Sequence, residues 1–120
     1  MTGKTQATGQ WGEEIAARYL ERKGYTIFAR NIHTAHGEID IVASKEAALI
    51  FVEVRTRSSH AFAYPEDSVT LRKQAHMLSA AEDYLQAHPE SPESWQFDVI
   101  AIERIPGGKP EIVHFENVIS

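Results

Sequence analysis

The sequence has 120 residues, of which 42% are hydrophobic and 24% charged, a composition typical of one globular domain with one core. It contains no cysteine, which excludes disulfides and thiolate metal sites, and no apolar run approaches the ~20 residues of a membrane span. The net charge of −5 argues against binding nucleic acid through overall basicity, so any phosphate contact must come from a local patch. The polar N-terminus lacks a signal-peptide core, and we expect a cytoplasmic protein without membrane contact.

Residues 1–8 are small and polar and are predicted to be a disordered tail, followed by a single domain at residues 9–120. The apolar periodicity predicts a first helix at 9–23, which ends at Gly24. A first strand is predicted at 25–31.

Two acidic residues lie side by side in the first helix. On a helical wheel Glu13 lies at the edge of the apolar face, so its side chain could point toward a site on a sheet, whereas Glu14 points to solvent. A purely structural explanation of Glu13 is also open, because the helix dipole favours an acidic residue in the first turn.

Residues 37–57 contain two runs rich in Ile, Val and Phe that are separated by a short polar break, which predicts a β-hairpin. The register that keeps the apolar side chains together places Asp40 opposite Glu53. Glu53 interrupts a strand that is apolar on both faces, so its carboxylate needs a partner. Two facing carboxylates can form the mouth of a site for a hard cation such as Mg²⁺, which takes oxygen ligands.

The same spacing is compatible with an ion cluster that holds no metal. In that arrangement Arg55 pairs with Glu38 and Glu53, and Arg57 pairs with Asp40. The residues alone leave the metal site and the ion cluster open.

The second half of the chain predicts a long helix between an N-cap at Thr70 and about His88. The helical spacing predicts this buried stripe: Leu71, Ala75, Leu78, Ala81 and Leu85. Its first turn contains Arg72, Lys73 and Gln74, and because the dipole disfavours cations there, an outside partner such as a phosphate is one explanation. A solvated surface pair of cations is the other, and it is the more common of the two.

Two further strands are predicted at 95–102 and 111–115, the last of them at a sheet edge. We assign no chemistry to Asp98, expect His114 at the surface, and interpret residues 33–37 as an exposed turn. The order of elements predicts an α/β fold with a mixed central sheet of about five strands flanked by helices. The long helix is expected to make a right-handed parallel crossover.

Several motifs occur in an order that resembles one protein family. They are Gly12-Glu13, Gly24-Tyr25, Asn31, Gly37-Glu38-Ile39-Asp40, Phe51-Val52-Glu53-Val54-Arg55-Thr56-Arg57, Arg72-Lys73-Gln74 and Phe97-Asp98-Val99. On these motifs the chain is identified as a member of the YraN family, small bacterial proteins of unassigned function. That family is similar to archaeal Holliday junction resolvases and to the restriction-endonuclease-like superfamily with its PD-(D/E)xK site.

The resemblance implies a restriction-endonuclease-like fold and a metal site. By position it implies Glu13, Asp40 and Glu53 as ligands of one or two Mg²⁺ or Mn²⁺ ions. The superfamily's catalytic lysine falls on Arg55. Because arginine keeps its proton in proteins, Arg55 is expected to stabilise charge on a phosphate or to orient water instead.

The first functional hypothesis is therefore a metal-dependent endonuclease that hydrolyses phosphodiesters in branched or structured DNA, with catalytic residues Asp40, Glu53, Arg55 and Glu13. Flanking phosphates would be contacted by the basic and polar residues Arg57, Arg72, Lys73 and Gln74. A homodimer is implied by the resemblance to resolvases. Two alternatives are a nucleic-acid-binding relative without turnover, and a scaffold protein whose cluster of acidic and arginine residues is structural.

Overall fold

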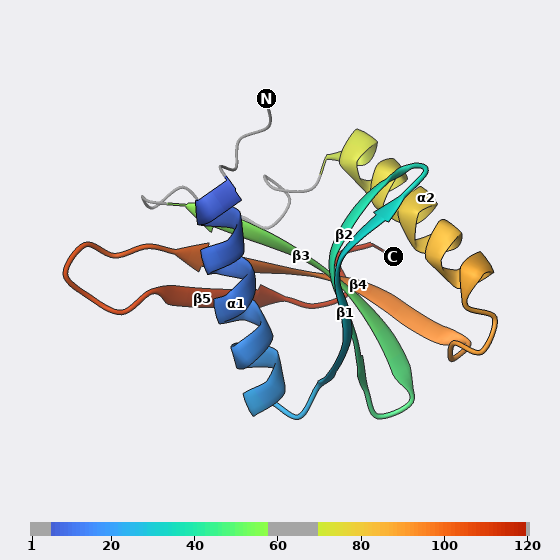
Figure 1. Cartoon of the computed structure of the whole chain (residues 1–120), viewed down its shortest axis with the longest axis horizontal. Helices are drawn as coiled ribbons and strands as arrows, with labels where there is room; N and C mark the ends of the chain where they lie inside the picture. Colours follow the sequence, from blue (N-terminus) through green and yellow to red (C-terminus); the bar gives the residue numbers. More distant parts are fainter. Residues whose placement is uncertain (1–5, 58–69, 120) are drawn as a thin grey trace.

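The computed structural model describes residues 6–57 and 70–119. Its elements are α1 (Gln6–Arg22), β1 (Thr26–Thr34), β2 (Gly37–Lys45), β3 (Ala48–Arg57), α2 (Leu71–Ala87), β4 (Ser94–Glu103) and β5 (Glu111–Phe115), as drawn in Figure 1. This is the predicted order of one helix, three strands, a second helix and two strands.

The five strands form one mixed sheet in the order β1-β2-β3-β4-β5. β3 and β4 are parallel, and the other three pairs are antiparallel. Parallel neighbours need a long connection, which α2 supplies, so the predicted α/β class, the parallel crossover and the edge position of β5 are confirmed. Among the described residues, no helix is both long and apolar enough to cross a membrane.

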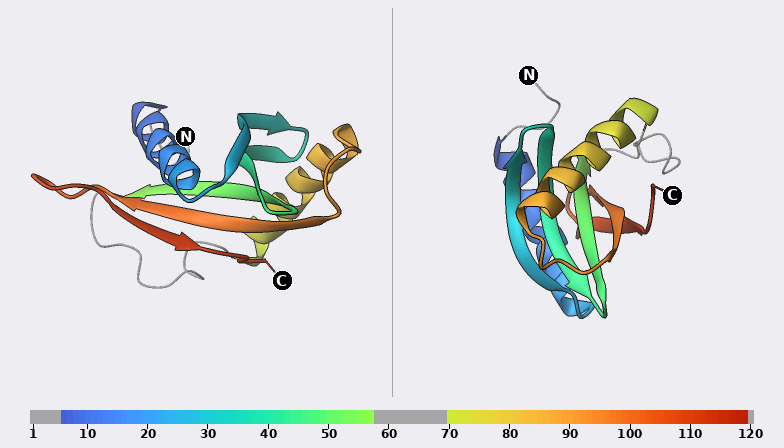
Figure 2. Two further views of the ribbon diagram at one scale, coloured as in Figure 1. Left: turned by 90° about the horizontal axis from the view of Figure 1, so that it is seen from below. Right: turned by 90° about the vertical axis from the view of Figure 1, so that its right-hand side faces the viewer.

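The two helices cover opposite faces of the sheet, and Figure 2 shows α1 lying along one side of the β3–β4 ribbon. Alternation along β3 explains this arrangement, since Val52 and Val54 pack with α1 while Leu49 and Phe51 pack with α2. Burying each of these side chains contributes about 1.5–3 kcal/mol. β3 is thus the central strand, as its two apolar faces predicted.

The first helix begins at Gln6 rather than at the predicted residue 9, and residues 1–5 of the predicted tail lie outside the described part of the chain. Its end matches the prediction. Gly24 has φ 93°, and the Tyr25 N–H donates to the Leu20 carbonyl at 3.0 Å, while the Gly24 N–H donates to the Glu21 carbonyl at 3.0 Å. This is a Schellman cap, which needs the left-handed conformation that glycine adopts without strain.

A second glycine sets how closely α1 approaches the sheet. A Cβ atom built on Gly12 would collide with the Thr56 hydroxyl and would also touch Val54. Any larger side chain at Gly12 would therefore push α1 away from β3 or displace Thr56. Gly12 keeps the neighbouring Glu13 close to the central strand.

The second helix starts as predicted but buries a face that only partly matches the predicted stripe. The Thr70 side chain accepts a hydrogen bond from the Lys73 N–H, which confirms the N-cap. The predicted residue Ala81 is buried and Leu85 packs against the core, whereas Leu71 is 84% exposed. The full set of buried residues is Met77, Ala80, Ala81 and Tyr84. The helix is rotated from the predicted face because Tyr84 packs edge-on against Phe51 of the sheet, and that contact buries a large aromatic surface.

The tip of the β1–β2 hairpin lies against α2 (Figure 1). β1 continues to Thr34, so His33 belongs to the strand rather than to the predicted turn. His36 Nδ1 lies 2.8 Å from Asp83 Oδ2, and hydrogen bonding from His36 lowers the pKa of the Asp83 carboxyl. This contact fixes the free end of the hairpin beside the helix.

Candidate functional site

The β2–β3 hairpin has the register that the sequence predicted, with Ile41 opposite Val52 at the end of the ladder. Asp40 and Glu53 adjoin this last pair on their two strands. The Val54 N–H donates a hydrogen bond of 2.8 Å to Asp40 Oδ2. The Asp40 carboxylate is therefore held against β3.

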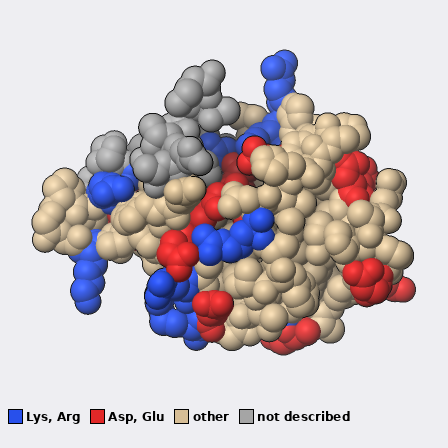
Figure 3. Space-filling view, in the orientation of Figure 1, with Lys and Arg blue, Asp and Glu red and all other residues tan. Residues whose placement is uncertain are grey.

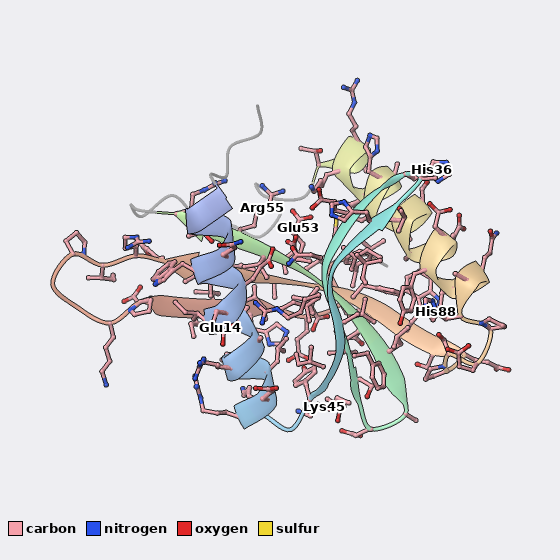
Figure 4. All side chains as sticks on the ribbon, viewed as in Figure 1. Glu14, His36, Lys45, Glu53, Arg55 and His88 are labelled. Carbon is pink, nitrogen blue, oxygen red and sulfur yellow. The ribbon has the colours of Figure 1, made fainter. Side chains whose placement is uncertain are left out.

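Glu53 is held between two cations. Its Oε2 atom lies 2.7 Å from Arg55 Nε, and its Oε1 atom lies 3.1 Å from Lys73 Nζ. The Glu53 side chain is 13% exposed, so two opposite charges offset the cost of removing this carboxylate from water. In the view of Figure 4, Glu53 and Arg55 lie between α1 and the β1–β2 hairpin.

Lys73 was predicted to contact a phosphate outside the protein, and the structure gives it a partner within the chain. The Thr70 cap fixes the first turn of α2, with the Gln74 N–H donating to the Thr70 carbonyl at 2.8 Å. From that turn the Lys73 side chain reaches Glu53 on β3. The ion pair explains why a cation is tolerated where the helix dipole opposes it.

Glu13 lies in the interior of the protein, with only 5% of its surface exposed. Since α1 begins at Gln6, Glu13 lies beyond the first turn, and the helix dipole does not account for it. Within residues 6–57 and 70–119, no three His, Asp or Glu side chains are grouped so that they could hold a metal ion. The role of Glu13 as a ligand stays a prediction.

Glu14 faces outward as predicted, but it is engaged by two arginines. Its carboxylate lies 3.0 Å from Arg30 NH1 and 2.8 Å from Arg18 Nε. Hydrogen bonds from Arg30 and then Arg18 lower the pKa of the Glu14 carboxyl. The arrangement links α1 to β1 on the protein surface, away from Glu53.

The other residues predicted to contact phosphates lie at the end of β3 and in the first turn of α2. Arg57 is the last residue of β3, and Arg72 is an exposed residue in the first turn of α2. Gln74 is half-buried in the same turn. Figure 3 shows acidic and basic side chains meeting in the hollow between α1 and the β1–β2 hairpin.

A second polar cluster was missed by the sequence interpretation. Asp98 is fully buried and accepts hydrogen bonds from Gln96 Nε2 and from the Asn117 N–H, both at 2.9 Å. Its other oxygen lies 2.7 Å from His114 Nε2, and His114 Nδ1 lies 3.1 Å from the Tyr19 hydroxyl. The expectation of a surface position for His114 is wrong, since its side chain is 7% exposed.

The same reasoning that singled out Glu53 could have found this cluster. Asp98 is the one charge in an apolar strand, so it also required a buried partner. Burial, followed by the nearby Asp98 carboxylate, raises the pKa of the adjacent Tyr25 to about 12. The cluster joins α1, β4 and β5, and we interpret it as structural.

Fold and site together define a small α/β protein with two carboxylates on neighbouring strands of a mixed sheet. The model of the uncharacterised protein family UPF0102 matches residues 12–102, and the chain belongs to this family, the YraN-type family that its motifs predicted.

Two similar relatives illustrate how much of the chain is shared. A UPF0102 protein of Syntrophomonas wolfei is 46% identical over 109 residues, which cover 91% of this chain and 94% of the relative. A UPF0102 protein of Syntrophotalea carbinolica is 45% identical over 115 residues, covering 96% and 93%. The names of these two relatives do not state an activity.

One solved structure, Pyrococcus furiosus SfsA in complex with Ca²⁺, is similar over 94% of this chain and 64% of its own. Its sequence identity is 19% and the TM-score is 0.42. That likeness is too weak to carry an argument about fold or function.

Proposed function

We propose that this protein has a restriction-endonuclease-like fold and acts as a metal-dependent nuclease on branched or structured DNA. The observation that supports the proposal best is that Asp40 and Glu53 adjoin the last residue pair of the β2–β3 ladder on neighbouring strands. Glu53 is nearly buried and is paired with two cations. A buried charged group of this kind is more common at functional sites than in a packed core.

The two carboxylates fit a hard divalent cation by their chemistry. Mg²⁺ is commonly held by one or two protein carboxylates, together with water and substrate phosphate oxygens. Asp40 and Glu53 would hold one ion, with Glu13 as a further acid. When bound, such an ion lowers the pKa of water and neutralises charge on a phosphate.

The remaining residues would act on the DNA backbone. Arg55 carries a permanent charge two residues from Glu53 and would face the scissile phosphate. Arg57, Arg72, Lys73 and Gln74 would contact flanking phosphates, which position a duplex without reading its sequence. A homodimer would suit a junction with two strands to cut.

A second candidate is a nucleic-acid-binding relative without turnover. It is favoured by Arg55 at the usual lysine position and by the double pairing of Glu53, which leaves this carboxylate neutralised without a metal. This candidate requires DNA binding that weakens with salt but does not depend on divalent ions. A scaffold protein would show neither property.

Thermal unfolding with Mn²⁺ tests the metal step. Mn²⁺ at ~100 times its dissociation constant should add about 2.7 kcal/mol to wild-type stability, raising the unfolding temperature by roughly 10 °C. Asp40→Asn should show no such rise, although its amide oxygen can still accept the Val54 hydrogen bond.

Glu14→Gln is the matched control, because it removes a carboxylate that pairs with Arg18 and Arg30 outside the site. This variant should keep the full Mn²⁺ response. Equal responses of wild type and Asp40→Asn, or no response of either, would contradict a metal site at Asp40.

A further inference from the structure

Lys73 occupies a cation position at the carboxylate site. Its ammonium group lies 3.1 Å from Glu53 Oε1, while Arg55 occupies the opposite oxygen. We propose that Lys73 is a displaceable counter-ion. It neutralises Glu53 in the metal-free protein, and a divalent cation releases it to contact the DNA phosphate.

The two cations differ in how easily they can leave Glu53. Arg55 lies on the same strand, is 23% exposed and approaches Glu53 to 2.7 Å. Lys73 comes from another element, is 41% exposed and lies further away. A lysine also carries its charge on a flexible four-carbon stem, so Lys73 can swing into solvent without moving β3.

Charge balance gives the reason for release. With both cations in place, each carboxylate oxygen of Glu53 already has a positively charged partner. A divalent cation at the same carboxylates would leave an excess of positive charge in a poorly solvated place. Moving the more exposed cation outward relieves this repulsion at the smallest cost.

The start of α2 gives the released group a direction. In the first turn of a helix the dipole disfavours a cation unless an anion lies nearby. Without Glu53 as its partner, the Lys73 ammonium would be best satisfied by a phosphodiester, next to the exposed Arg72. The same lysine would thus compete with the metal before DNA binds and hold DNA afterwards.

The inference rests on the proposed metal site, and a Mn²⁺ titration by calorimetry separates the two. Lys73→Gln should bind Mn²⁺ about two- to fivefold more tightly than wild type, the gain expected when one half-exposed competing ion pair is removed. Arg72→Gln removes the same charge one residue away and should leave the Mn²⁺ affinity unchanged. Both substitutions lie near the helix start, and Arg55 still pairs with Glu53 in Lys73→Gln, so a thermal unfolding curve of each variant checks that it is folded before the titration.

Each result has one meaning. Tighter binding by Lys73→Gln than by Arg72→Gln supports the proposal, as does binding by Lys73→Gln alone. Equal affinities of Lys73→Gln and wild type, with Asp40→Asn not binding, would overturn the counter-ion role and leave the metal site intact. No binding by any variant would overturn both.

Discussion

Replacing Asp98 with alanine should cost about 3–5 kcal/mol of stability, the effect of removing one partner of a buried polar pair. The Asp98 carboxyl group is fully buried and is bonded to three groups on β4, β5 and the chain that follows β5. Alanine would leave the His114 ring and the Asn117 N–H without their acceptor. Because the total free energy of unfolding of a domain of this size is only about 5–15 kcal/mol, the unfolding temperature should fall by roughly 10–20 °C.

Urea unfolding of wild type and Asp98→Ala measures this cost, and Asp83→Ala provides the control. Asp83 also pairs with a histidine, His36, but that pair is on the surface and should contribute little. If Asp98→Ala unfolded at the same urea concentration as Asp83→Ala, the cluster would not hold α1, β4 and β5 together.

A four-way DNA junction incubated with the protein and Mn²⁺ should be cut, and Asp40→Asn should cut at least about 100-fold more slowly. The proposed metal site loses one of its carboxylate ligands in this variant, and a 100-fold loss corresponds to about 2.7 kcal/mol of transition-state stabilisation. The rate of product formation on a denaturing gel is the measurement. Glu14→Gln should cut at the wild-type rate.

Forks and flaps should be tested beside the junction, since the site does not define which branched structure is bound. Wild-type protein that cuts none of them in Mg²⁺ or Mn²⁺ would count heavily against the nuclease. Binding that persists and weakens with salt would then favour the relative without turnover. In that case Arg72→Gln should reduce the salt dependence while Asp40→Asn leaves binding unchanged.

The hairpin was predictable from sequence because its information is local. Alternation and a short turn were enough to place Asp40 opposite Glu53, since a one-residue slip would bury Asp40 among the apolar residues of the other face. The caps were equally local, and both Gly24 and Thr70 act where predicted. Such features depend on neighbours within a few residues.

The partners of the buried charges were not predictable, because they come from distant parts of the chain. Lys73 reaches Glu53 only after α2 has packed on the sheet, and His114 is buried only because Asp98 and Tyr19 surround it. The buried face of α2 was ambiguous in the same way. Its sequence contains two apolar stripes, and packing of Tyr84 on Phe51 selected the one that the wheel did not favour.

The parallel pairing of β3 and β4 has a consequence for how the chain folds. β2 and β3 are joined by a two-residue turn. β3 can pair with β4 only after the long chain segment between Arg57 and Ser94 has closed into a loop. Loop-closure entropy makes the first pairing fast and the second slow. We therefore expect hydrogen-exchange labelling during refolding to protect the Val54 amide before the amides of β4, and simultaneous protection would contradict this order. The two carboxylates would then meet early in folding, and the lysine that neutralises one of them would arrive last.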